Sequence, residues 1–183
     1  MNANFDVTEV IIKTERLILR PWQPSDLDDF YEYASVKGVG EMAGWHHHET
    51  IQKTEEILNR FIEEKKTFAI VLKQNNKVIG SLGIEYIEES PMIESPLCGR
   101  EIGYVLSKDY WGKGYMPEAG HAVIDYCFKT LNYDFLLCGY FKWNNQSRRV
   151  CEKLGFKFLK EILFQTRMGY QEATDLCILY NHK

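Results

Sequence analysis

The chain has 183 residues, 45% hydrophobic and 26% charged, a composition that suits one globular domain spanning residues 1–183. Its formal net charge of -4 argues against a protein that grips a nucleic-acid backbone, because such proteins usually carry a basic surface. No window approaches the roughly 18 to 20 apolar residues of a membrane span, and the first ten residues lack a signal-peptide pattern. We therefore expect a cytoplasmic protein with no membrane or nucleic-acid partner, whose five scattered cysteines are reduced and mostly buried.

The N-terminal half of the sequence predicts two helices and three strands. Leu17 and Leu19 alternate with more polar neighbours, which predicts a strand over 14–21 with one buried face. A helix begins near Ser25 or Asp26, either of which can cap it. Apolar residues at helical spacing predict a second helix over 50–64. Two apolar runs, 67–73 and 77–86, flank the turn signal Asn75-Asn76 and predict a hairpin.

The C-terminal half alternates strands with helices. Its strands are predicted over 100–107, 135–141, 156–164 and 174–180, its helices over 117–131 and 147–154, and a loop over 90–99. Gly155 is expected to end the second of these helices as a left-handed cap. Helices interleaved with strands, together with a hairpin, favour a mixed α/β fold. We expect a mostly antiparallel central sheet of about seven strands, flanked by helices on both faces.

A glycine turn, Gly112 to Gly114, stands between a predicted strand and a predicted helix. The N–H groups of such a turn and of the first helical turn lack intrahelical partners, so together they can bind a phosphate or pyrophosphate. The turn lacks the P-loop pattern, and Pro117 replaces the third glycine of a dinucleotide-binding motif. Glycines at this spacing alone also fit a plain tight turn, so the pattern leaves both interpretations open.

The segment around the turn resembles the acetyl-coenzyme A loop of the GNAT superfamily of N-acetyltransferases, [RQ]-x-x-G-x-[GA]. Gly114 takes the place of the glycine, whereas Trp111 and Met116 depart from the first and last positions. The run Y-W-G-K-G-Y followed by E-A is similar to the branch named for ribosomal-protein N-terminal acetyltransferases, the RimJ/RimL-like branch. Three further segments resemble that branch in order and spacing: T-E-R-L-I-L-R-P at 14–21, E-I-G-Y-V-L at 101–106 and N-N-Q-S-R-R-V-C-E-K-L-G-F at 144–156.

The resemblance spans about residues 13–180 and implies the GNAT acyl-CoA N-acyltransferase fold. It implies an enzyme that transfers acetyl from acetyl-CoA, as co-substrate, to a primary amine on a protein N-terminus or a small molecule. The alternative is a non-catalytic acyl-CoA-binding regulatory module. Relatives often form homodimers, but no feature of this sequence demonstrates one.

The same resemblance implies which residues contact acetyl-CoA. The strand at 101–106 would separate from its neighbour at 135–140, and backbone groups in the opening would pair with the pantetheine arm. The N–H of Val105 would polarise the thioester carbonyl. Asn144 would hydrogen-bond the pantetheine or acetyl region, and Arg149 either contacts a phosphate or is a solvated helix charge. The full set is Tyr104, Val105, Leu106, Gly112, Lys113, Gly114, Tyr115, Met116, Pro117, Asn144, Ser147 and Arg149.

Acetyl transfer to an amine also calls for proton transfers, because an alkyl ammonium with a pKa near 10 must be neutral to attack. Glu101 is the first candidate base, since GNAT enzymes often place a carboxylate at this point, and Glu85 is the second. Cys151 occupies the position where many relatives place a tyrosine that protonates the leaving thiolate. Ser147 is another candidate donor, or else it caps the helix that begins there.

The segment between the two N-terminal helices is implied to wall the acceptor cleft. His48 matches the histidine of a W-x-x-H pattern of this branch, and Tyr31, Tyr33 and Trp45 either line the cleft or pack in the core. Adjacent histidines at 46–48 cannot all face one ion, and no carboxylate or cysteine is spaced to help them. We therefore expect no metal site.

Overall fold

Eight strands of the described chain form one continuous sheet. The computed structural model describes residues 2–87 and 96–181, and its strands follow the order β1-β2-β3-β4-β5-β6-β8-β7. Every neighbouring pair is antiparallel except β5 and β6, which run parallel. The strands are β1 Ile12–Lys13, β2 Leu17–Pro21, β3 Thr67–Leu72, β4 Val78–Glu85, β5 Gly99–Leu106, β6 Phe135–Phe141, β7 Lys157–Gln165 and β8 Gln171–Tyr180. The predicted mixed, mostly antiparallel sheet is confirmed, with the short β1 as an additional strand.

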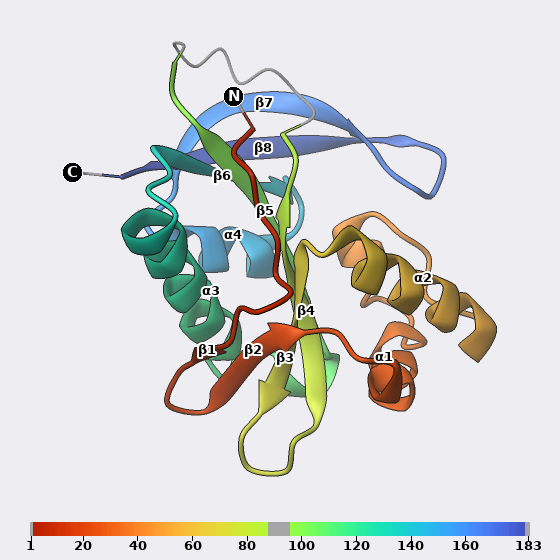
Figure 1. Cartoon of the computed structure of the whole chain (residues 1–183). Coiled ribbons are helices and arrows are strands. Elements are labelled where there is room, and N and C mark those ends of the chain that lie inside the picture. Colours follow the sequence, from red (N-terminus) through yellow and green to blue (C-terminus); the bar gives the residue numbers. More distant parts are fainter. Residues whose placement is uncertain (1, 88–95, 182–183) are drawn as a thin grey trace.

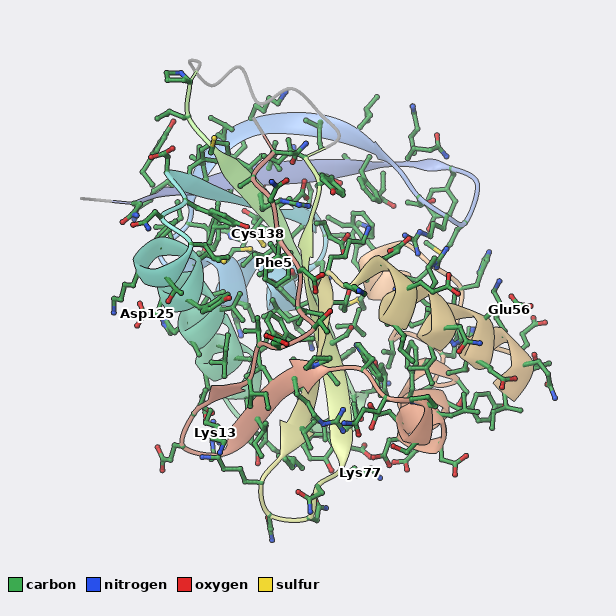
Figure 2. All side chains as sticks on the ribbon, viewed as in Figure 1. Phe5, Lys13, Glu56, Lys77, Asp125 and Cys138 are labelled. Atoms are coloured by element: carbon green, nitrogen blue, oxygen red, sulfur yellow. The ribbon has the colours of Figure 1, made fainter. Side chains whose placement is uncertain are left out.

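Two helices cover each face of the sheet (Figure 1). Helices α1 Leu27–Ala34 and α2 Ile51–Glu64 pack on one face, and α3 Tyr115–Asp125 and α4 Asn145–Lys153 pack on the other. The charged side of each amphipathic helix faces outward, as Glu56 on α2 shows in Figure 2. The shorter segments are the 3-10 turns η1 Pro24–Asp26, η2 Glu41–Ala43 and η3 Lys108–Tyr110, and a π-helical continuation of α3, η4 Tyr126–Thr130.

Strand β3 explains why both faces need helices. Its six residues are all buried. Phe68, Ile70 and Leu72 pack into the cluster under α3 and α4, whereas Ala69 and Val71 pack into the cluster under α1 and α2. Because successive side chains of a strand point to opposite faces, a continuous apolar run is stable only when both faces are covered. Each such large apolar side chain contributes roughly 1.5–3 kcal/mol on burial.

The starts of the two helices near the glycine turn differ from the sequence-based boundaries. Helix α3 begins at Tyr115, two residues before Pro117, because Gly114 lies at φ 81 and acts as the N-cap residue. Helix α4 begins at Asn145, because the Asn144 side chain accepts a hydrogen bond from the Ser147 N–H at 3.0 Å. The alternative in which Ser147 caps this helix is therefore wrong.

The remaining predicted boundaries hold within a residue or two, apart from the starts of β2 and β8, each of which differs by three residues from the prediction. Thr50 caps α2 by accepting from the Lys53 N–H at 3.2 Å, and Gly155 follows α4 at φ 88, as predicted. Most of the predicted loop at 90–99 lies outside the described residues. No helix in the described part of the chain is long and apolar enough to span a membrane.

Candidate active site

The parallel strands β5 and β6 separate part of the way along their length. Their pairing includes Gly99 with Phe135, Arg100 with Leu136, and Glu101 with Leu137. No further pair joins these two strands among the described residues, although β5 continues to Leu106. The predicted opening between these strands is therefore present, and it leaves one edge of β5 without a sheet neighbour in the middle of the fold.

The direction of the β5 amides corrects the expected role of Val105. The Ser107 N–H donates to the Ile79 carbonyl of β4 at 2.8 Å. The Val105 carbonyl also points at β4, because a Cβ atom added to Gly80 of β4 would lie 2.4 Å from the carbonyl oxygen. Because backbone groups alternate sides along a strand, the Val105 N–H faces β4 and cannot polarise a thioester in the opening. The backbone groups that face the opening are those of Tyr104 and Leu106, and the Leu106 carbonyl accepts from the Trp111 indole at 2.7 Å.

A groove of about 360 Å³ begins at this opening and extends to the glycine turn. Its walls contain every predicted cofactor-binding residue except Lys113. The exposed Lys113 instead places its Nζ 5.6 Å from the centre of the Tyr110 ring. The wall also contains residues that sequence reasoning missed, namely Val39, Met42, Ala43, Tyr110, Gln146, Val150 and Lys153.

The glycine turn has the geometry of an anion site. Gly112 and Gly114 lie at φ 74 and φ 81, in the left-handed region that favours glycine. Helix α3 starts directly afterwards at Tyr115, so its first N–H groups and the positive end of its dipole are directed toward the turn. A Cβ on Gly112 would meet no atom of the described part of the chain within 4 Å, which leaves the outer side of the turn open to a ligand.

A half-buried clamp fixes the turn to the segment just before β2. The Glu118 carboxylate accepts from the Thr14 hydroxyl at 2.5 Å, from the Arg16 N–H at 2.8 Å and from Arg16 Nε at 2.6 Å. Arg16 also donates to the Lys113 carbonyl at 3.0 Å and lies over the Tyr115 ring. Burial alone would raise the pKa of Glu118, but the hydrogen bonds from Thr14 and Arg16 outweigh it and lower that pKa. Sequence reasoning missed this clamp, and its signal is the pairing of T-E-R at 14–16 with the E-A that follows the turn.

Two cationic side chains of α4 line the groove. Arg149 and Lys153 are four residues apart, which places them on one side of the helix, and both belong to the groove wall. The adjacent Arg148 instead pairs with Glu152 at 2.9 Å, away from the groove. Of the two consecutive arginines, only Arg149 therefore lines the groove.

A hydrogen-bonded group lies on the α4 side of the opening. The Tyr104 hydroxyl lies 2.8 Å from Ser147 Oγ and 3.7 Å from Cys151 Sγ. Burial raises the pKa of Tyr104 well above its usual value, so this phenol stays protonated. Ser147 lines the groove, whereas Cys151 does not. Asn144 is buried and uses its side chain within the protein, because its Nδ2 donates to the Met42 carbonyl at 3.1 Å.

The two candidate bases lie side by side at the closed end of the opening, on the opposite face of the sheet from Tyr104. Glu85 on β4 and Glu101 on β5 are direct cross-strand partners. Glu85 forms an ion pair with Lys66 at 2.8 Å. A Cβ atom added to Gly139 of β6 would lie 3.7 Å from Glu101 Oε1. The Glu101 carboxylate therefore extends from β5 across the opening to β6. Neither carboxylate belongs to the groove wall itself.

The predicted acceptor residues do not line the groove. His48 is 6% exposed, its Nδ1 lies 2.8 Å from Thr54 Oγ1, and its ring packs against Phe30 and Trp45. Burial lowers the pKa of His48 to about 4, so this ring is neutral at physiological pH. Tyr31 is half-buried on α1 and also lies outside the groove wall. Tyr31, Trp45 and His48 therefore lie outside the groove wall, and their implied role in an acceptor cleft stays a prediction.

The loop before α2 nevertheless contributes to the groove, through Met42 and Ala43. Glu41 holds this loop, because its carboxylate accepts from the Gly38 N–H at 2.7 Å and pairs with His47 Nδ1 at 2.9 Å. Although burial opposes ionisation, the hydrogen bonds from His47 and Gly38 lower the pKa of Glu41 to about 2. Among the described residues, no cluster of three or more His, Cys, Asp or Glu side chains is placed to hold a metal ion.

Comparison with known proteins identifies this arrangement. The fold is shared with a GNAT-family acetyltransferase from Bacillus anthracis (TM-score 0.81, 23% identity, covering 95% of this chain and 100% of that one). Residues 16–157 match the model of the acetyltransferase (GNAT) domain. The chain therefore belongs to the GNAT acetyltransferase family.

Other relatives agree with this assignment. The chain is 28% identical over 150 residues to the uncharacterized N-acetyltransferase p20 of Bacillus licheniformis, covering 79% of this chain and 80% of p20. It has the fold of a ribosomal-protein-S5-alanine acetyltransferase from Vibrio fischeri (TM-score 0.72, 24% identity, covering 96% and 98%). It also has the fold of a spermidine N-acetyltransferase from Vibrio cholerae solved with CoA and spermine (TM-score 0.70, 19% identity, covering 92% and 97%).

Proposed function

We propose that this protein transfers the acetyl group of acetyl-CoA to a primary amine, on a protein N-terminus or a small molecule. The observation that carries the proposal is the groove that joins the glycine turn to the open edge of β5. One end of this groove offers backbone N–H groups for a diphosphate, and the other offers a free strand edge for an extended arm. A solved relative that holds CoA on the same fold supports this assignment.

Each part of acetyl-CoA has a matching part of the groove. The amides around Gly112, Gly114 and Tyr115 would hold the diphosphate, because they combine free donors with the helix dipole. Arg149 and Lys153 would meet the remaining phosphate of the coenzyme. The amide-bearing pantetheine arm would pair with the Tyr104 and Leu106 backbone in the manner of an added strand.

The chemistry follows from the groups at the closed end of the opening. The amine attacks the thioester carbonyl, a C–N bond forms, and the C–S bond breaks. The Tyr104 N–H, which faces the opening, is placed to stabilise the oxyanion, and a donor of this kind is worth about 2.7–4 kcal/mol. Glu101 takes the proton from the amine, directly or through water. The Ser147 hydroxyl, hydrogen-bonded to Tyr104, passes a proton to the departing thiolate and regains one from water.

The acceptor side of the proposal rests on the face of β5 that carries Glu101. Gly103 is exposed although it lies in a central strand, and a bare glycine in a strand often marks the close approach of a ligand. Glu85 and Glu101 give this face negative charge, which favours a cationic amine before it loses its proton. The relatives that act on a ribosomal-protein alanine and on spermidine are precedents for both acceptor types, and the motifs favour the RimJ/RimL-like branch.

Release of CoA thiol from acetyl-CoA, measured with a panel of amines, tests the proposal. The panel contains peptides with free N-terminal alanine or serine, polyamines and amino acids. We expect turnover with at least one of them, and we expect Glu101→Gln to reduce it while the exposed β7 control Glu161→Gln leaves it unchanged. If acetyl-CoA raises the melting temperature but no amine is acetylated, the non-catalytic binding module is the correct alternative.

A further inference from the structure

Three of the five cysteines converge where α4 packs on the sheet. The sulfur atoms of Cys138 on β6 and Cys151 on α4 lie 3.2 Å apart, and both residues are buried. Cys177 on β8 is the direct cross-strand partner of Cys138. Figure 2 labels Cys138 in the interior of the molecule. Thirteen residues separate Cys138 from Cys151 in the sequence, so the packing of helix on strand, and no local motif, brings the two thiols together.

A second cavity gives access to this group. It has a volume of about 480 Å³ and shares no residue with the groove, so the two hollows lie on different sides of α4. Cys151 and Cys177 both line it, whereas Cys138 does not. The other lining residues are Tyr140, Arg148, Glu152, Phe156, Lys157, Phe158 and Asp175. A small molecule entering this cavity therefore meets Cys151 before Cys138.

We propose that Cys151 and Cys138 form a modification site that a hydroperoxide converts into a disulfide. The Cys151 thiolate attacks a peroxide oxygen, the O–O bond breaks, and Cys151 becomes a sulfenic acid. The Cys138 sulfur then attacks the Cys151 sulfur, an S–S bond forms, and water leaves. With hydrogen peroxide the two thiols lose two electrons and two protons in total, and the peroxide is reduced to two molecules of water.

The hydrogen bonds around the pair agree with this assignment of roles. The contact with Cys138, followed by that with Tyr104, lowers the pKa of Cys151, although burial opposes the change. The same contact, together with burial, raises the pKa of Cys138. Cys151 is thus the thiol with more thiolate character, which is the form that reacts with peroxide, and Cys138 is the resolving thiol.

The disulfide would also change the groove, an effect that rests on the proposed function. Bond formation shortens the sulfur–sulfur distance from 3.2 Å to about 2.05 Å. It also removes the thiol that lies 3.7 Å from the Tyr104 hydroxyl, which in turn contacts Ser147. We therefore expect peroxide to reduce acetyl transfer about tenfold, a change of about 1.4 kcal/mol in activation free energy, and a dithiol reductant to restore it.

Peptide mapping tests the disulfide without any need for acetyl-CoA. Cleavage after Lys and Arg places every cysteine on a different peptide: 78–100, 114–129, 130–142, 150–153 and 168–183. After treatment of the folded protein with graded hydrogen peroxide, we expect peptides 130–142 and 150–153 to be joined. A link to 168–183 instead, or stable over-oxidation of Cys151 with no link, would overturn the pairing. Oxidation confined to Cys98 would overturn the site.

Cysteine variants distinguish the proposed Cys138–Cys151 disulfide from non-specific oxidation of other thiols. Cys138→Ser and Cys151→Ser should each abolish the link, and Cys127→Ser, which removes another buried thiol, should leave it intact. If either of the first two variants does not fold, the wild-type map still decides the question. Formation of the link in a protein that acetylates no amine would support the thiol site and count only against the proposed enzyme.

Discussion

Replacement of Glu118 by alanine is the sharpest test of how the glycine turn is held. Glu118→Ala removes three hydrogen bonds at once. Those from the Thr14 hydroxyl and the Arg16 N–H are partly buried and are each worth about 1.5 kcal/mol as hydrogen bonds to a charged group. The ion pair with the Arg16 side chain, which is 40% exposed, adds at most about 1 kcal/mol.

The sum predicts a loss of about 3 kcal/mol in the free energy of unfolding. For a protein of this size this corresponds to a decrease of roughly 6–12 °C in melting temperature. The affinity for acetyl-CoA should fall as well, by about tenfold or 1.4 kcal/mol, because Arg16 also holds the Lys113 carbonyl of the turn. Urea unfolding and a titration with acetyl-CoA measure the two effects separately.

Helix α3 supplies a matched control for this experiment. Asp125→Ala removes another ion pair on the same helix, the one with Lys129, in which both side chains are largely exposed. Its effect should stay within about 0.5 kcal/mol. If Glu118→Ala costs no more than this control, the clamp does not hold the turn, and the reasoning from its partly buried hydrogen bonds is refuted.

Three further outcomes follow from the same structure. Glu101→Gln should lower kcat by about 10²-fold or more without changing KM for acetyl-CoA, as expected for a general base, whereas an equal loss in Glu85→Gln would contradict this assignment. The free energy of unfolding should fall as pH decreases from about 6.5 towards 4, because His48, whose pKa is lowered to about 4 in the folded protein, takes up a proton on unfolding. In His48→Gln the free energy of unfolding should depend less on pH in this range, and an unchanged dependence would exclude His48 as its origin. Asn144→Ala should cost about 1–2 kcal/mol in urea unfolding, because it removes a helix cap and the bond to Met42, and a smaller change would show that the cap is not needed.

Local patterns in the sequence predict the regular elements of this fold well. The alternation at Leu17 and Leu19 and the apolar run of β3 depend only on neighbouring residues, and both strands are present. The glycine turn is also visible, because positive φ at Gly112 and Gly114 needs no distant partner. The predicted start of a helix is wrong where two nearby residues could each cap it. Asn144 and Ser147 are both good caps, and only the α4 backbone shows which of them is used.

The site is predicted less completely because its geometry depends on distant residues. Arg16 and Glu118 are 102 residues apart, so neither residue reveals the clamp by itself. The side to which the Val105 N–H points depends on the register between β4 and β5, and one step of register reverses the answer. The match of His48 to a W-x-x-H pattern marks it in the sequence, but the pattern does not show that its ring is buried and packs against Phe30 and Trp45.

Gly103 connects stability with function at the centre of the proposed acceptor face. Among the described residues, a Cβ at this position would meet only Glu85 Cγ, at 4.0 Å, so Gly103→Ala fits without strain. Alanine is favoured over glycine in a strand by roughly 0.5–1 kcal/mol, and the variant should therefore be more stable than the wild type. If the amine approaches β5 over this bare position, the added methyl group should raise KM for the amine severalfold. KM for acetyl-CoA should stay unchanged, because in the proposed complex acetyl-CoA would lie along the strand edge and on the opposite face. A variant that is more stable and has an unchanged KM for the amine would show that the acceptor reaches the thioester by another route.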